Sequence, residues 1–402
     1  MKKLLLWGMI PMIIMLVYFF FEPIFTYNVG WQPLPNEVTD AESHVMDSAF
    51  VSAVDGANKM LAEARKELQA PAISVAVGIG NKLVWARAKG YKDIDKQDPA
   101  DIKTVFRIGS VSKAITSVAL GKLLEQQKLQ LDKPVQYYAS YVSMETPITI
   151  RQLASHTSGI RNYGLCLCFP AFEYYNNKEY ESIEESVDVF QHDDLLFEPG
   201  SRYSYSSYNY TLLSAALEEA AGIPFLNYVD REIFTPIGMK HTAADHVSMQ
   251  IDERATFYDV EKGQYKVAFP VNNSNKWAGG GFVSSPSDLV RLGNALLNDE
   301  ILKKSTIDIL FTPQKLNDGS INEEGYALGW RVEPEHSLFD GKKLTPVAHH
   351  GGVAMGSTAF LVLFPEYNMV VALAMNRNKP PEYSSFSKYA FSIAEAFLRE
   401  SD

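Results

Sequence analysis

Helix-like and strand-like patterns of hydrophobic residues follow one another along this chain in a clear order. A helical spacing of apolar residues over 47–68 precedes two short strand-like runs, 73–77 and 83–86, which a glycine-containing turn joins into a predicted antiparallel hairpin. After about residue 325 the apolar period changes to two. Four further strands are predicted there, followed by a last helix: 328–332, 346–350, 358–363, 369–374, and the helix 384–399.

This order predicts an α/β domain over residues 45–400, built on an antiparallel sheet with N- and C-terminal helices beside it. The α/β part is expected over about 45–134 and 300–400. Residues 135–299 carry mostly helical patterns with many breakers and are expected to form a helical inserted part. Sequence position alone therefore predicts that a discontinuous sheet receives a helical insertion.

The N-terminus carries an apolar segment. Lys2 and Lys3 precede residues 4–21, which contain no charge and would span about 27 Å as a helix, close to the thickness of a bilayer core. A cleaved signal peptide would have a shorter apolar region and a small-residue cleavage site, whereas this segment ends in phenylalanines. We therefore expect residues 1–3 to be cytoplasmic, 4–21 to form an uncleaved transmembrane anchor and 22–43 to be a tether.

The composition argues against several classes of function. The formal charge of −11 and the absence of a basic block argue against a nucleic-acid partner. Cys166 and Cys168 are too few for a disulfide framework or a zinc site and too close for an unstrained mutual bond, so small buried residues are the expected role. An acidic run over 171–198 is expected to be a solvated face.

The predicted location of the domain is outside the cytoplasm, in the periplasm or on the outer side of the cell membrane if the chain is bacterial.

Ser110 and Lys113 are the first candidate catalytic pair. They stand three residues apart at the start of a predicted helix, so the hydroxyl and the amine would share one face of its first turn. A lysine in a partly desolvated site can take the proton of a serine nucleophile, and the helix N-terminus favours a developing oxyanion. The same spacing occurs by chance, and the second copy at Ser385 and Lys388 is read as part of a surface helix.

Two downstream stretches could complete the site. Tyr205 follows a Pro-Gly turn, and a nearby ammonium would favour its phenolate as a general base, although a simply packed tyrosine is the alternative. The run His349-His350-Gly351-Gly352 lies in a predicted strand, where glycine lets a substrate approach and the Gly352 N–H could face an oxyanion. Neighbouring strand residues point to opposite faces, which disfavours a zinc site at these histidines.

Other motifs carry weaker signals or are absent. The glycines at 279–281 are read either as a plain turn or as a third part of the site, and His156 as a structural hydrogen-bonding residue. The chain has no G-x-S-x-G, H-E-x-x-H or G-x-x-x-x-G-K-[ST] motif. No metal and no cofactor are therefore predicted.

Taken together and in order, three motifs resemble those of the serine β-lactamase and penicillin-binding-protein superfamily, most closely its class C β-lactamase-related branch. They are Ser110-Val111-Ser112-Lys113, Tyr205-Ser206-Ser207 and His349-His350-Gly351. Supporting stretches with the same habits lie at 106–109, 152–159, 197–200, 236–239 and 326–330. The resemblance covers about residues 45–400 and implies a β-lactamase/transpeptidase-like fold.

The resemblance also implies roles. Ser110 would be the acylated nucleophile, Lys113 its proton acceptor, Tyr205 the general base and acid, and the N–H groups of Ser110 and Gly352 the oxyanion hole. Ser207, His349 and Gly351 would bind substrate. Two positions depart from the pattern: Ser207 replaces the usual asparagine, and His349 stands where true class C β-lactamases carry lysine.

These departures favour a peptidase or esterase over an antibiotic hydrolase. We expect a serine hydrolase acting through a Ser110 acyl-enzyme on a small peptide, D-amino-acid amide or ester, with peptidoglycan fragments among the conceivable substrates. Two alternatives stay open: a β-lactamase proper, and a non-catalytic protein of the same fold that binds cell-wall peptide. The sequence does not predict an oligomeric state.

Overall fold

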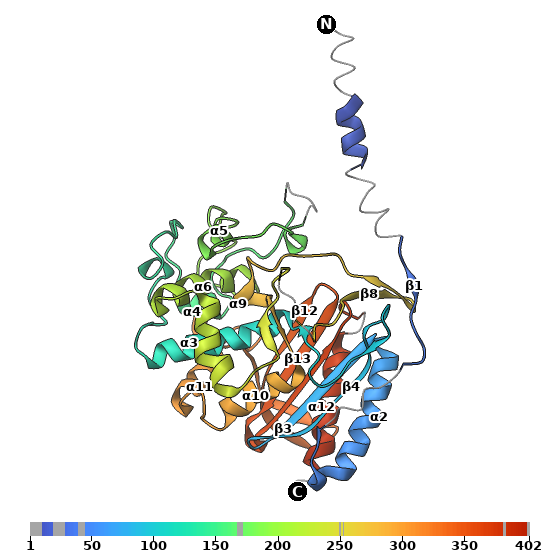
Figure 1. The fold of residues 1–402 in the computed structure, drawn as a ribbon. Helices are drawn as coiled ribbons and strands as arrows, with labels where there is room; N and C mark the ends of the chain where they lie inside the picture. Colours follow the sequence, from blue (N-terminus) through green and yellow to red (C-terminus); the bar gives the residue numbers. More distant parts are fainter. Residues whose placement is uncertain are drawn as a thin grey trace.

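The computed structural model describes residues 10–18, 29–38, 45–166, 172–248, 251, 253–380 and 383–399. Its centre is an antiparallel sheet in the order β11-β12-β13-β14-β3-β4-β2, with β5 (Asp98–Pro99) also paired to β4 (Figure 1). The strands of this path are β2 (Val45–Met46), β3 (Ala72–Ile79), β4 (Lys82–Asp93), β11 (Arg331–Leu338), β12 (Lys343–Ala354), β13 (Ser357–Phe364) and β14 (Met369–Met375). N-terminal and C-terminal strands meet where β14 pairs with β3, which joins the two ends of the chain into one sheet.

Two helices cover the outer face of this sheet. They are α2 (Val51–Glu67) and α12 (Tyr383–Leu398), from opposite ends of the domain, and they lie side by side in Figure 1. Phe397 of α12 packs with Phe50 and with Trp85 of β4, at ring-centroid distances of 5.7 and 6.0 Å. Burial of aromatic and aliphatic groups on this scale is the main force that holds such a layer in place.

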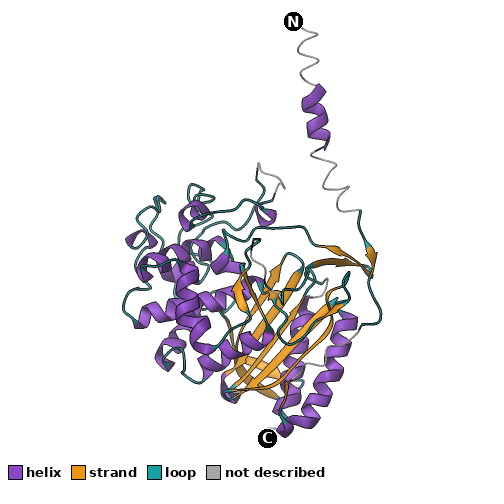
Figure 2. Cartoon of the chain, in the orientation of Figure 1, coloured by secondary structure: helices purple, strands orange, loops and turns teal. Residues whose placement is uncertain are grey.

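Apart from the helical residues 10–18, which lie away from the domain, the other helices lie on the opposite side of the sheet, as the colours of Figure 2 show. Within this layer α10 (Pro286–Leu297) packs directly on β3 and β14, although it falls in the range predicted as the helical part. A Cβ added at Gly293 would come within 2.6 Å of Val370, so this glycine lets helix and sheet approach closely. The remaining helices are α3 (Ser112–Glu125), α4 (Ile150–Ala154), α5 (Ile183–Val187), α6 (Tyr208–Ala221), α7 (Phe225–Val229), α8 (Thr235–Ile237), α9 (Trp277–Gly280) and α11 (Lys304–Phe311).

Two small antiparallel sheets complete the described part of the fold. One has the order β1-β9-β8 and the other β6-β10-β7. Their strands are β1 (Gln32–Pro33), β6 (Phe106–Arg107), β7 (Thr242–Ala244), β8 (Tyr258–Glu261), β9 (Gln264–Val267) and β10 (Phe282–Ser284). The second sheet fixes the chain directly before Ser110, because Arg107 of β6 pairs with Val283 of β10.

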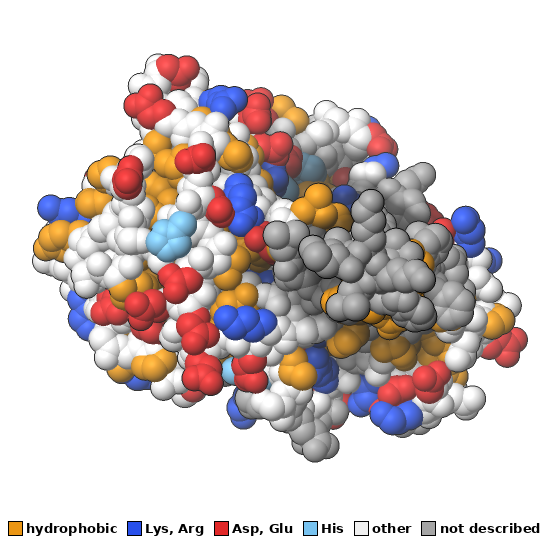
Figure 3. Space-filling view, turned by 90° about the horizontal axis from the view of Figure 1, so that it is seen from above, with side chains coloured by type: hydrophobic (Ala, Val, Ile, Leu, Met, Phe, Trp, Pro, Cys, Tyr) orange, Lys and Arg blue, Asp and Glu red, His pale blue; other side chains and the backbone are white. Residues whose placement is uncertain are grey.

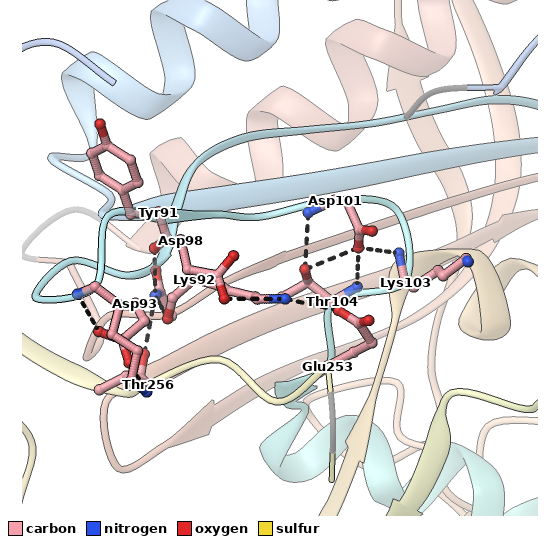
Figure 4. Close-up of polar contacts among 11 residues, drawn as sticks. Tyr91, Lys92, Asp93, Asp98, Asp101, Lys103, Thr104, Glu253 and Thr256 are labelled. Atoms are coloured by element: carbon pink, nitrogen blue, oxygen red, sulfur yellow. Dashed lines mark hydrogen bonds and ion pairs between the residues drawn. The ribbon is translucent and has the colours of Figure 1, made fainter. Parts of the chain in front are cut away.

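Polar contacts hold the segment that leads into β6. Lys92 of β4 bonds Glu253 at 2.9 Å and pairs with Asp98 at 3.4 Å, and Thr256 donates to Asp93 at 3.2 Å (Figure 4). Next to them, the Val105 N–H donates to the Glu253 carbonyl. The strand β4, the loop at 253–256 and the approach to Ser110 are thereby tied together.

Most predicted elements are confirmed. The hairpin is β3 and β4, the terminal helices are α2 and α12, and three of the four late strands lie within β12, β13 and β14. The prediction of a strand from residue 328 is wrong, because β11 begins at Arg331; Gly329, with a φ of +96°, lies in the turn before it. The acidic run is solvated as predicted: Glu184, Glu185 and Asp188 in and after α5 are exposed, and Figure 3 views the molecule from the side on which α5 lies.

Two predictions concern segments that the structure describes only in part. Of the predicted anchor 4–21, residues 10–18 are described and are helical and exposed. Among the described residues, no helix combines the length and the apolar character that crossing a membrane requires. Cys166 is half-buried and disulfide-bonded, so the expectation of a buried thiol is wrong for it, and Cys168 lies outside the described residues.

Candidate active site

Ser110 lies in a 3₁₀ turn, η2 (Gly109–Val111), that ends where α3 begins. Strand β12 runs closely past this turn. A Cβ added at Gly352 would come within 1.9 Å of the Ile108 carbonyl oxygen and 3.1 Å of the Ser110 nitrogen, and one added at Gly109 would meet the backbone of Val353. Glycine at both positions therefore lets the strand lie directly beside the serine.

Strand β12 also has an open edge at this point. Its pairing with β11 ends at the pair of Arg331 with His349, whereas its pairing with β13 continues to Ala354. The backbone from His350 onward is consequently free of β11 where it passes Ser110. This placement puts Gly352 next to Ser110, as a shared oxyanion hole would need.

Lys113, in the first turn of α3, is completely buried. Its Nζ lies 3.2 Å from Ser110 Oγ, 3.2 Å from Ser207 Oγ and 2.6 Å from the carbonyl oxygen of Gly279. None of its partners among the described residues is a carboxylate. Burial without a compensating negative charge lowers the pKa of Lys113 well below its ordinary value, which favours the neutral amine. A neutral amine beside Ser110 can accept its proton.

Tyr205 lies over the same lysine, with Lys113 Nζ 4.9 Å from its ring centroid. The phenol hydrogen-bonds with Ser110 and Ser207, and these bonds lower its pKa, but burial dominates and raises it to about 12. The expectation that a neighbouring ammonium primes the phenolate is therefore wrong. The lysine is itself driven toward its neutral form, so little positive charge is available to stabilise a phenolate.

His156 packs against the ring of Tyr205. It is fully buried with a φ of +59°, and its ring lies 4.2 Å from that of Tyr205. Its Nδ1 accepts from the Ser206 N–H at 3.3 Å, in keeping with the structural role expected from sequence. Burial, with the nearby Lys113, lowers the pKa of His156 well below its ordinary value and keeps the imidazole neutral.

The two adjacent histidines of β12 lie on opposite faces of the sheet, as strand geometry requires. His349 is half-buried, its Nε2 lies 2.9 Å from Glu333, and its ring is 5.4 Å from that of Phe360, a residue of the core under α12. His350 instead lies on the side of Lys113 and Tyr205, and its Nε2 accepts from the Tyr326 hydroxyl at 2.9 Å. Sequence reasoning selected His349, which lines a cavity together with Ser110 and Tyr205, and did not select His350, whose ring lies 6.5 Å from that of Tyr205.

His350 is buried, and burial lowers its pKa well below its ordinary value. Its Nδ1 donates to the Gly351 carbonyl at 2.7 Å, which completes the neutral tautomer. The side chain that faces the site from this strand is thus uncharged.

Ser207, at the position where the resembled pattern has asparagine, accepts a hydrogen bond from Lys113. An asparagine is nevertheless present beside it, because Asn162 Oδ1 accepts from the Ser207 N–H at 3.0 Å. Asn162 comes from the loop after α4, and sequence reasoning missed it since it lies outside every motif. The glycines at 279–281 form the end of α9 and supply a carbonyl to Lys113, so they belong to the site.

Ser110 lies where two cavities meet. The first, of 460 Å³, is lined by Ser110, Tyr205 and Ser207 together with Asn162, Asn273 and Lys276. The second, of 730 Å³, is lined by Ser110 and Tyr205 together with His349, His350, Gly351 and Arg331. Lys113 lines neither cavity and lies behind the serine. The fold thus joins Ser110, Lys113, Tyr205, Ser207, Gly351 and Gly352 in one region, and His349 lines the second cavity beside them.

Comparison with known proteins assigns this chain to a family of serine hydrolases. The Beta-lactamase family matches residues 57–392, which is most of the chain. The chain belongs to the β-lactamase family. As a member of this family it is a serine hydrolase with the fold shared by β-lactamases and penicillin-binding proteins.

Among curated β-lactamase relatives, the chain is 32% identical to the human serine β-lactamase-like protein LACTB, mitochondrial, over 79% of this chain and 73% of that protein. It is 25% identical to penicillin-binding protein 4* of Bacillus subtilis, over 77% and 69%. Among solved structures, the hydrolase EstCE1 has a TM-score of 0.71 at 23% identity, over 87% of this chain and all of that chain. A D-amino acid amidase from Ochrobactrum anthropi has a TM-score of 0.70 at 21% identity, over 87% and 98%.

Proposed function

We propose that this enzyme hydrolyses amide or ester bonds through an acyl-enzyme on Ser110. One observation carries the proposal: the fully buried Lys113 amine lies 3.2 Å from Ser110 Oγ and has no carboxylate partner among the described residues. A lysine held in this way is a base, whereas a lysine in an ion pair would stay protonated. The substrate class that we propose is a small peptide, a D-amino-acid-containing amide or an ester.

In the acylation step, Ser110 Oγ attacks the substrate carbonyl carbon and its proton passes to the Lys113 amine, which becomes an ammonium. The substrate carbonyl oxygen becomes an oxyanion. Its proposed donors are the N–H groups of Ser110 and Gly352, which the close approach of β12 to η2 places side by side. The charge created on Lys113 and the oxyanion then lie close together and stabilise each other.

Collapse of this intermediate breaks the bond to the leaving nitrogen or oxygen, which needs a proton. Tyr205 hydrogen-bonds with Ser110 and keeps its own proton at neutral pH, so we assign it to donate to the leaving group while Lys113 restores it. Water then attacks the Ser110 ester and gives its proton to Lys113. Collapse of the second tetrahedral intermediate breaks the bond to Ser110 Oγ, Lys113 returns its proton to that oxygen, and the carboxylic acid is released.

The substrate class is supported by what faces the site. His349 holds the position at which the resembled β-lactamases carry lysine, the neighbouring His350 that lies beside Tyr205 is neutral, and Ser207 takes the place of asparagine. Both changes weaken binding of a β-lactam carboxylate at that position. Structural relatives whose names include an amidase and a promiscuous acyltransferase hydrolase also support amide and ester chemistry.

A substrate panel tests this proposal. Purified protein is assayed with D-Ala-D-Ala peptides, D-aminoacyl amides, short-chain esters and nitrocefin, each with a Ser110→Ala control. We expect turnover of at least one amide or ester that is absent in Ser110→Ala, and slow or no turnover of nitrocefin. Fast nitrocefin turnover with no amide or ester activity would instead make the chain a β-lactamase proper, and binding without any turnover would make it a non-catalytic member.

We also propose that the apolar N-terminal segment anchors the enzyme in a membrane and that the catalytic domain acts outside the cytoplasm. The uncharged run at 4–21 supports this location. Membrane fractionation of the full-length chain, compared with a form that lacks residues 1–28, tests it. Equal recovery of both forms in the soluble fraction would contradict the anchor.

A further inference from the structure

A second buried lysine lines the first cavity and has no part in the mechanism above. Lys276 lies directly before α9 and is 6% exposed. Its Nζ donates to the Tyr174 carbonyl at 3.1 Å and lies 5.2 and 5.6 Å from the ring centroids of Tyr174 and Tyr163. An ammonium has three donors, and this one partner among the described residues leaves two without an acceptor.

The surroundings of Lys276 do not neutralise it. Asp245 is the carboxylate whose charge favours the Lys276 ammonium, but it is bound at 2.6 Å by Arg107 and at 2.7 Å by Arg254, and it also accepts from Asn273 at 2.7 Å. Two guanidinium groups thus already outweigh this one carboxylate. Glu173, next to Tyr174, is bound through both oxygens by Arg161. The acids near Lys276 are therefore committed to arginines.

The cavity itself contains no acid among its described lining residues. Its polar lining consists of hydroxyl and amide side chains, including Ser207, Asn162 and Asn273, with Lys276 as the one lining cation. A buried polar group without a partner is costly, and a buried cation more so. Such a group is stabilised when a ligand supplies the missing negative charge.

We propose that this cavity receives a carboxylate carried by the substrate and that Lys276 binds it. The inference rests on the proposed function only in placing the scissile bond at Ser110, which lines the same cavity. Lys276 is then a specificity-determining residue, and the preferred substrates are amides or esters with a second, free carboxylate. The aromatic rings of Tyr163 and Tyr174 hold the ammonium in place while it binds.

The lysine's ionisation gives this binding a signature. Burial, together with the nearby Arg107, lowers the pKa of Lys276 to about 7, and Asp245 only partly offsets this. An incoming carboxylate favours the ammonium and raises that pKa. Binding above pH 7 should therefore take up a proton, and the preference for an acidic ligand should weaken as the pH rises further.

Binding to the Ser110→Ala variant, measured by calorimetry, tests the proposal without requiring hydrolysis. The probes are N-phenylsuccinamic acid and its glutaryl and adipyl homologues, each against the matched neutral anilide, and a second series with the carboxylate on the amine side. We expect at least about tenfold tighter binding of the best acid than of its neutral match, with proton uptake at pH 8 seen by comparing buffers of different ionisation enthalpy. Each further substitution is made in the Ser110→Ala variant. Lys276→Met should reduce the preference for the acid to less than about threefold, and Lys276→Arg should retain part of that preference. Lys128→Met, at an exposed position, is the control and should retain all of it.

A purely structural Lys276 would weaken acid and neutral ligands equally when replaced, which would overturn the proposal. The absence of any acid preference or proton uptake in both series, in protein with an unaltered lysine, would overturn it as well, whether or not Lys276→Met folds. If the acid preference is present but wild type hydrolyses no amide or ester, the proposed function fails and the carboxylate site stands.

Discussion

One buried lysine, Lys113, contacts the nucleophile and a second, Lys276, lines a cavity with it, and the surroundings of the two differ. Lys113 has three oxygen acceptors, from Ser110, Ser207 and Gly279, and no access to either cavity. Lys276 has one acceptor and lines a cavity. Burial lowers the pKa of both. The difference indicates that a buried lysine acts as a base where it contacts a proton donor such as Ser110. A buried lysine that lines a cavity and has few hydrogen-bond acceptors is instead suited to bind a ligand.

The largest expected effect is at Lys113. Replacement by methionine removes the proton acceptor and should reduce turnover by about 10² to 10⁴. Replacement by arginine keeps the charge but cannot accept a proton near neutral pH, so it should lose as much. Steady-state rates on the best substrate of the panel, with Lys128→Met as a surface control, check both. A Lys113→Arg variant that retains normal rates would show that the lysine acts as a charge and not as a base.

Replacement of Tyr205 by phenylalanine should cost less than loss of Lys113, about 10² in turnover, because a protonated phenol contributes only the proton of the leaving group. Esters with a good leaving group such as nitrophenolate need less protonation and should lose less than amides do. A loss larger than that of Lys113→Met, on both substrate types, would mean that Tyr205 is the base and that the two roles are misassigned.

The smallest expected effect concerns stability and pH at Lys276. Its folded pKa of about 7 lies below the unfolded value of 10.5, so between these values the unfolded chain binds one more proton than the folded chain. The free energy of unfolding should therefore rise with pH in this window, by about 1.4 kcal/mol per unit for one such group. Urea denaturation at pH 7.5 and 8.5 should show that the free energy of unfolding rises less with pH in Lys276→Met than in wild type. The same rise in both proteins would contradict the lowered pKa.

The sequence was informative where chemistry is local. Ser110 and Lys113 are three residues apart, and the strands and terminal helices follow from hydrophobic period, so these features could be predicted. Gly109 and Gly352 carry a signal too, since glycine beside a catalytic motif indicates close backbone approach, and the structure shows the two backbones in contact.

The rest of the site depends on tertiary placement. Which of His349 and His350 faces the serine depends on the register of β12, and a shift of one residue exchanges the two faces. Asn162 and Lys276 are far apart in the sequence and lie in no recognisable motif, and only the fold brings both to the first cavity. The pKa of Tyr205 depends on how far the fold removes its phenol from water, and this effect outweighs that of the charge that the sequence suggested.

The most direct test of the central claim is covalent labelling at Ser110. Intact protein is treated with a fluorophosphonate probe, and the adduct is measured by mass spectrometry and located by peptide mapping. The account predicts one adduct on Ser110 in wild type, none in Ser110→Ala, and unchanged labelling in Ser385→Ala, which alters the second Ser-x-x-Lys sequence. Equal labelling of wild type and Ser110→Ala would contradict it.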